Sequence, residues 1–122
     1  MIAKKNRLNL ALEKNSAIFS RESSKFASSN SLLAYFRPND QQLLASCLVP
    51  KTIFKKASKR NFYRRLLYSF LEKAILSKAF SLEKKIDLVI VLKRDFNTGT
   101  EVINLEKDFN RLLQKIENEI SR

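Results

Sequence analysis

Histidine is absent from this 122-residue sequence, and cysteine and glycine occur once each, as Cys47 and Gly99. Without histidine the chain has no Ser-His-Asp triad, no histidine general base and no histidine metal ligand. One cysteine cannot form a zinc cage or an intramolecular disulfide, and its apolar neighbours predict a small core side chain. One glycine excludes a P-loop and a GxGxxG turn. We therefore expect no catalytic group and no metal site among the protein's own side chains.

Long apolar runs are also missing. No stretch of about 18 apolar residues occurs, so the sequence predicts no membrane-spanning helix. The basic N-terminus is not followed by a long apolar segment, which argues against a signal peptide. A hydrophobic content of 44% favours a folded chain, and 122 residues suit a single domain, 1–122, with one core. We expect a cytoplasmic protein that does not contact membranes.

Acidic residues are scarce in the middle of the chain. Lys and Arg number 24 against 12 Asp and Glu, which gives a net charge of +12. The stretch from Lys51 to Phe70 is strongly basic, and no acidic residue occurs between Asp40 and Glu72. Surface segments normally mix charges, because opposite charges pair and like charges repel. A segment with cations alone therefore predicts a polyanionic partner, and the phosphates of a nucleic acid fit.

The second half of this basic stretch has the spacing of an amphipathic helix, with Ser58 as its N-cap. The apolar residues that recur every three or four positions are Tyr63, Leu66, Leu67, Phe70, Ala74 and Ile75. At about 100° per residue, the opposite face carries Asn61, Arg64, Arg65 and Tyr68, with Arg60 at its edge. A solvated basic face is the ordinary interpretation of such a pattern, but the lack of acidic partners favours contact with phosphates.

The residues before the basic stretch predict a helix, a loop and two strands. The imperfect spacing of Leu8, Leu12 and Phe19 indicates a short helix near residues 9–20. The serine-rich segment 20–30 predicts a loop. Residues 31–36 and 43–49 are strand candidates, and the turn Arg37-Pro38-Asn39-Asp40 between them predicts an antiparallel hairpin.

The residues after it predict a buried strand and a packing helix. The run IDLVIVL at 86–92, interrupted only by Asp87, is typical of a central strand. A crossover helix between 43–49 and 86–92 would make these strands parallel neighbours. Asn104 is the expected cap of a last helix, with Glu106 and Asp108 in its first turn. Its apolar stripe is Leu105, Phe109, Leu112, Leu113, Ile116 and Ile120.

The basic stretch contains, in order, Lys51, Ala57, Arg60-Asn61, Arg64-Arg65 and Leu66. This arrangement resembles the lysine-rich loop and Arg-Asn-x-x-Lys/Arg-Arg helix of the protein subunit of bacterial ribonuclease P. The similarity extends to Lys5-Asn6-Arg7-Leu8 near the N-terminus, to Phe19, to the strand that follows Asp87 and to the last helix. Two departures stand out, because the family has basic residues where this chain has Phe62 and Tyr68.

The resemblance implies an α+β fold with the order αβββαβα, in which a small mixed sheet is packed by helices and its βαβ crossover is left-handed. It is a fold shared with a domain of a small-subunit ribosomal protein. It also implies that the protein is part of a ribonucleoprotein enzyme. This enzyme is an endonuclease, and so a hydrolase, that removes the 5′ leader of precursor tRNA. The catalyst would be the RNA subunit, which holds Mg²⁺, and the protein would bind that RNA and the leader.

The resemblance also assigns candidate site residues. Those expected to contact the catalytic RNA are Lys51, Lys55, Lys56, Lys59, Arg60, Asn61, Arg64, Arg65 and Tyr68, the last by stacking on a base. Those expected to contact the precursor leader are Phe19, Tyr35 and Phe36. Because Tyr35 and Phe36 face opposite ways in a strand, only one of them can line that surface.

Two other functions are compatible with the same charge pattern. A structural ribosomal RNA-binding protein would use the same layout but would support no cleavage. A DNA-binding regulator would need a dimer surface and symmetric half-sites, and no apolar helix face is left over to supply one. We therefore expect RNA partners and no DNA partner.

Overall fold

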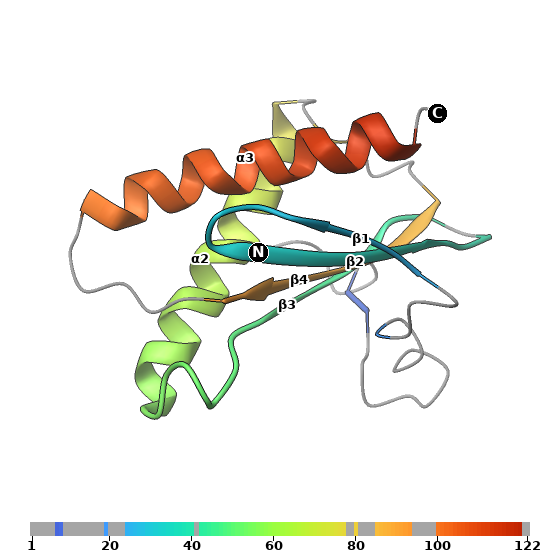
Figure 1. Ribbon diagram of the computed structural model, residues 1–122. Coiled ribbons are helices and arrows are strands. Elements are labelled where there is room, and N and C mark those ends of the chain that lie inside the picture. Colours follow the sequence, from blue (N-terminus) through green and yellow to red (C-terminus); the bar gives the residue numbers. More distant parts are fainter. Residues whose placement is uncertain are drawn as a thin grey trace.

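The computed structural model describes residues 7–8, 19, 24–40, 42–77, 80, 85–93 and 100–120. Within these residues the elements follow in the order β1 (Lys25–Ser28), β2 (Leu32–Pro38), β3 (Leu44–Leu48), α2 (Ala57–Leu76), β4 (Ile86–Leu92) and α3 (Thr100–Ile120) (Figure 1). The predicted α+β class and the order of strands, helix, strand and helix are confirmed. The helix predicted near residues 9–20 lies outside the described residues, apart from Phe19.

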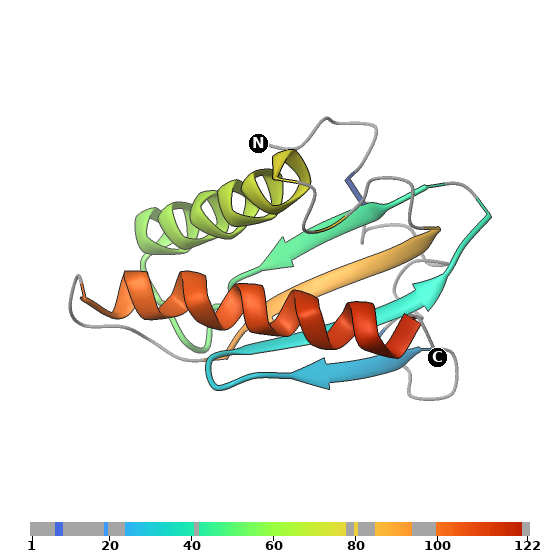
Figure 2. The same ribbon diagram turned by 90° about the horizontal axis from the view of Figure 1, so that it is seen from above.

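The strands form one mixed sheet in the order β1-β2-β4-β3 (Figure 2). As predicted, β3 and β4 are parallel neighbours, with Leu44 opposite Asp87. The predicted hairpin of β2 and β3 is wrong, because β4 lies between them and pairs antiparallel with β2. The physical reason is burial: six of the seven residues of β4 are buried, and an inner position covers such a strand best.

The segment predicted as a loop contains β1, so the prediction for 20–30 is wrong at 25–28. This edge strand exposes Lys25 and Phe26 and has no apolar run, and its pairing with β2 depends on contacts that the local sequence does not encode. Strand β2 continues to Pro38, beyond its predicted end. Pro38 lies past the part of β2 that pairs with β1, at a strand end where proline is tolerated.

Both helices contribute to one core with a single face of the sheet. In Figure 1, α3 runs across the sheet, and α2 contacts both α3 and β3. Alternate residues of the strands point into this core, Ala34 and Phe36 among them. The predicted stripe of α3 is buried, except that Ile120 is 36% exposed. Cys47 is a buried free thiol of the core, as predicted.

Both helices begin earlier than the sequence predicted. Helix α2 begins at Ala57 rather than after Ser58, and the residue at its N-cap makes no side-chain cap hydrogen bond. Helix α3 begins at Thr100, so the predicted cap residue Asn104 lies inside it. Propensity signals place helix ends poorly, because tertiary contacts can add a turn.

Asp108 ties α3 to the turn between β1 and β2. Its buried carboxylate accepts hydrogen bonds from Ser29 Oγ at 2.8 Å, from the Asn30 N–H at 3.2 Å and from the Ser31 N–H at 2.8 Å. A carboxylate that satisfies the donors of a turn fixes that turn in place. The β1–β2 hairpin is therefore anchored on the helical layer as well as within the sheet.

Candidate nucleic-acid interface

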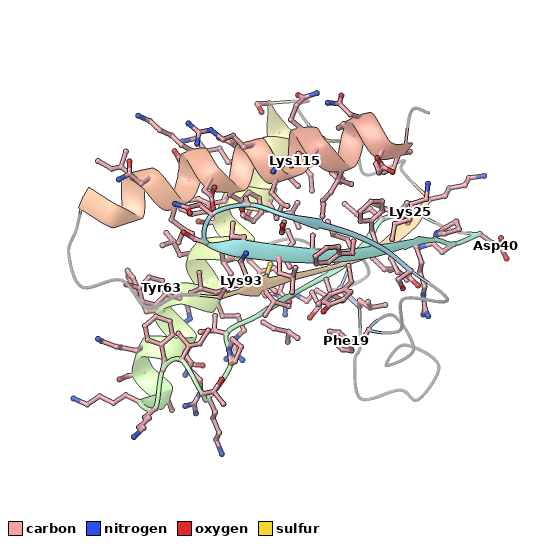
Figure 3. The ribbon with its side chains drawn as sticks, in the orientation of Figure 1. Phe19, Lys25, Asp40, Tyr63, Lys93 and Lys115 are labelled. Atoms are coloured by element: carbon pink, nitrogen blue, oxygen red, sulfur yellow. The ribbon has the colours of Figure 1, made fainter. Side chains whose placement is uncertain are left out.

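The first candidate surface is the loop before α2 together with the first turns of that helix. We call it the basic end, and its exposed cations are Lys51, Lys55, Lys56, Lys59, Arg64 and Arg65. Figure 3 shows long side chains extending away from the sheet around Tyr63, near the start of α2. The expected cationic surface is thus present, and its members come from one continuous part of the chain.

Aromatic packing holds the loop of the basic end against the helix. Phe54 is buried, and its ring stacks on Tyr63 with centroids 4.7 Å apart and an interplanar angle of 21°. The Lys59 ammonium lies 5.9 Å from the centroid of the Phe54 ring, within cation–π range. The N–H groups of Ile53 and Phe54 both donate to the Pro50 carbonyl. The loop that carries Lys51, Lys55 and Lys56 is therefore held in a defined conformation.

Arg60 differs from its neighbours because its guanidinium is engaged within the protein. Its Nη1 donates to the carbonyls of Phe54 and Lys55, each at 2.9 Å, and the residue is half-buried. Arg64 donates from Nη2 to the Asn61 side-chain oxygen. Arg60 thus fastens the loop to the helix, while Arg64 and Arg65 remain exposed for contact with phosphates.

Tyr68 is not on the exposed face, and its predicted stacking on a base is wrong. The residue is 7% exposed, and its hydroxyl accepts a hydrogen bond from the Cys47 N–H at 3.2 Å. The Arg7 guanidinium lies 5.5 Å from the centroid of the ring. The helical spacing misplaced this residue because α2 also packs against β3, which widens its buried face beyond one stripe.

The second candidate surface is a group of aromatic rings on the sheet face opposite the helices. We call Phe19, Phe26 and Tyr35 the aromatic patch. Phe19 contacts Tyr35 edge to face, with centroids 5.2 Å apart, and Phe26 lies 6.1 Å from the same ring. Figure 3 shows Phe19 on the side of the sheet away from α3. Phe19 is 41% exposed and Phe26 is 51% exposed.

The structure separates the two candidates that share β2. Tyr35 belongs to the aromatic patch, whereas Phe36 is 2% exposed and lies in the core beneath the helices. Phe36 therefore cannot contact a leader, and its assignment is corrected. Sequence reasoning missed Phe26, because it falls in a segment predicted as a loop. Only the register of β1, which places Phe26 opposite Tyr35, reveals it.

Asp87, the polar interruption of β4, accepts hydrogen bonds from Arg37 Nε and Asn39 Nδ2, both at 2.9 Å. It is thereby paired in spite of its burial, and it joins the ends of β2 and β4. Among the described residues, no three His, Cys, Asp or Glu side chains gather where they could hold a metal ion. No helix in the described ranges is long and apolar enough to cross a membrane.

A mixed sheet with two helices on one face, a cluster of exposed cations at one helix end and an exposed aromatic patch together define a small basic α+β protein. The sequence model of the family described as Ribonuclease P matches residues 3–117, which is nearly the whole chain. The chain therefore belongs to the ribonuclease P protein family.

Solved structures of bacterial ribonuclease P proteins share the fold. The protein from Thermotoga maritima is 21% identical, with a TM-score of 0.60 over 92% of each chain. The protein from Staphylococcus aureus is 12% identical, with a TM-score of 0.64 over 91% of this chain and 94% of that one. A second Thermotoga maritima structure, in complex with 1-(4-fluorophenyl)-2-thiourea, has a TM-score of 0.59. No curated protein sequence gives a significant match.

Proposed function

We propose that this ribonuclease P protein binds the catalytic RNA of the enzyme through the basic end and the 5′ leader of precursor tRNA through the aromatic patch. Family membership supports a part in tRNA 5′ processing. In this proposal the RNA subunit cleaves the phosphodiester bond, and the protein positions the two RNA molecules.

The main support for RNA binding is the set of exposed cations at the basic end. Six cations are exposed on one continuous segment, and no acidic residue lies between Asp40 and Glu72 to neutralise them. Each cation that pairs with a phosphate displaces a condensed counterion from the RNA, which favours binding. Arginine adds to this effect because its planar fork can bond two phosphate oxygens at once. Such a surface is suited to an RNA and not to a small neutral ligand.

The aromatic patch suits a flexible single strand. Unpaired bases stack on exposed aromatic rings, and each such contact typically contributes ~1–3 kcal/mol. Phe19 and Phe26 flank Tyr35 in the patch. A leader that has no fixed base pairs can place its bases on these rings, whereas a duplex cannot.

Magnesium is assigned to the RNA partner in this proposal. The described residues offer no group of three metal-binding side chains, and the whole sequence lacks histidine. The phosphates of RNA are the oxygen ligands that magnesium commonly takes.

The test is cleavage of a precursor tRNA by a bacterial ribonuclease P RNA at low magnesium, with and without the protein. We expect the protein to increase cleavage at the mature 5′ end. The double variant Arg64→Ala/Arg65→Ala should weaken RNA binding and reduce the slope of log K against log salt by roughly 1.4–1.8, because two phosphate contacts are lost. Lys107→Ala/Arg111→Ala, which removes two exposed cations of α3, is the matched control.

Two results would contradict the proposal. The first is an equal loss of affinity in the Lys107→Ala/Arg111→Ala control, which would mean that net charge alone drives binding. The second is tight binding to ribosomal RNA with no increase in precursor cleavage, which would favour the structural ribosomal protein instead. A cytoplasmic location stays a prediction.

A further inference from the structure

Phe62 is a large apolar side chain on the otherwise polar face of α2. It is 54% exposed, although it lies between Asn61 and Tyr63 in the middle of the basic end. Exposed single apolar residues are common on proteins, so exposure alone carries no argument. Three further observations distinguish Phe62: its anchoring, the depression beside it and the charge around it.

The Phe62 ring is held in place by its neighbours. It meets the Tyr63 ring edge to face, with centroids 5.1 Å apart and an interplanar angle of 83°. Tyr63 in turn stacks on the buried ring of Phe54. The three rings form a chain from the core to the surface, so the outermost ring is pre-positioned and loses little freedom when a partner binds.

A surface depression of about 510 Å³ lies beside this ring, lined by Ser58, Asn61, Phe62, Arg65, Leu66 and Ser69. These residues share one side of the helix because they are spaced by three, four and seven positions. The depression has an aromatic side, an amide, hydroxyl groups and a guanidinium. A planar ring with polar edges and an attached phosphate would meet a matching group at each point.

The positive charge around Phe62 indicates which kind of ligand the depression binds. The cations of the basic end attract a polyanion, and phenylalanine cannot bind a phosphate. An aromatic ring among cations is instead the combination that binds unpaired nucleotides, with the base on the ring and the backbone on the cations. An apolar group of a protein partner would need acidic neighbours to meet the same cations.

We propose that Phe62 and the depression beside it bind one unpaired base of the RNA, which stacks on the Phe62 ring while Arg65 pairs with the adjoining phosphate. Asn61 supplies amide donors for the edge of the base. This inference rests on the proposed function, since it requires the basic end to be the RNA-binding surface. It adds to that surface a contact whose strength does not depend on salt.

The test compares substitutions of Phe62 in the full chain, with a bacterial ribonuclease P RNA transcript as the probe. Phe62→Ala and Phe62→Leu should weaken binding roughly 5- to 150-fold, whereas Phe62→Tyr, which keeps the ring, should bind as the parent does. The dependence of affinity on salt should be the same in all of them, because no ionic contact is lost. Leu76→Ala, which removes another exposed apolar side chain of α2, is the matched control and should have no effect.

A second measurement locates the contact directly. Ultraviolet irradiation of the complex, followed by trypsin, should give an RNA adduct on the peptide Asn61–Arg64, with fragment masses that assign it to Phe62. Parent-like affinity of Phe62→Leu, or an adduct absent from this peptide, would overturn the base-stacking inference. If the parent protein itself failed to bind the transcript, the proposed function would fail with it. If the parent bound the transcript and the Phe62 variants bound it with the same affinity, the base-stacking inference alone would fail and the proposed function would stand.

Discussion

Replacement of Asp108 by alanine should destabilise the protein strongly, although the residue lies far from both candidate surfaces in sequence. The carboxylate accepts three hydrogen bonds from the β1–β2 turn, and the Ser31 N–H that donates to it at 2.8 Å is buried. Each buried donor left without an acceptor costs ~1–3 kcal/mol. The Asn30 N–H and the Ser29 hydroxyl are only partly buried, so each can partly recover a bond with water. We expect a loss of roughly 2–4 kcal/mol in the free energy of unfolding.

Urea unfolding followed by circular dichroism measures this loss. With a slope of ~2 kcal/mol per molar urea, the middle of the usual range, the unfolding midpoint of Asp108→Ala should fall by roughly 1–2 M. Asp108→Asn keeps one acceptor oxygen and should fall less. Lys107→Ala, at the neighbouring exposed position of the same helix, is the control and should unfold within ~0.5 kcal/mol of the parent.

A double-mutant cycle separates the bond between Asp108 and the Ser29 hydroxyl from the two bonds that backbone N–H groups donate. Ser29→Ala removes the hydroxyl, which donates to Asp108 at 2.8 Å and also lies 3.4 Å from the Leu32 carbonyl oxygen, and should cost ~1 kcal/mol. In the background of Asp108→Ala the same substitution should cost less, because only the longer contact of the hydroxyl with the Leu32 carbonyl, at 3.4 Å, remains to be lost. Additive losses would show that the two side chains do not interact, and a midpoint of Asp108→Ala equal to that of Lys107→Ala would refute the argument.

Three more variants or treatments test the core. Leu67→Ala should lower the free energy of unfolding by ~2–5 kcal/mol, because it leaves a cavity at a fully buried position. A loss as small as that of Arg64→Ala in the same urea experiment would mean that Leu67 does not lie on the face of α2 that packs against the core. Tyr68→Phe should cost ~1–3 kcal/mol, because the Cys47 N–H loses its acceptor, without changing RNA affinity. Burial raises the pKa of the Cys47 thiol, so iodoacetamide at pH 8 should alkylate it in urea but not in the native protein, as mass spectrometry would show.

The basic end could be predicted from the sequence because exposed charge needs no tertiary information. Lysines and arginines are mostly exposed in any fold, although Arg60 is half-buried and bonded to two backbone carbonyls. The helical spacing located the buried Leu67 correctly. The same spacing misplaced Tyr68. A periodicity of 3.6 residues gives the centre of the buried face, but its width depends on how many elements pack against the helix.

The aromatic patch could be predicted only in part. Tyr35 and Phe36 were known to face opposite ways, yet which one points to the core depends on the side that the helices cover. Phe26 was missed because β1 is a short edge strand with little apolar signal, and its position opposite Tyr35 follows from register alone. Strand pairing is a long-range property, which also explains why the β2–β3 hairpin was predicted wrongly.

The sheet order β1-β2-β4-β3 has a consequence for how the protein is made. The strand that joins the two halves of the sheet, β4, is synthesised after both of its neighbours, separated from them by the whole of α2. Until Leu92 has left the ribosome, β2 and β3 each present an unpaired edge, and such edges associate readily with other chains. Completion of the sheet therefore waits for a late, long-range insertion, and a nascent chain that stalls before Ile86 is the form most exposed to aggregation.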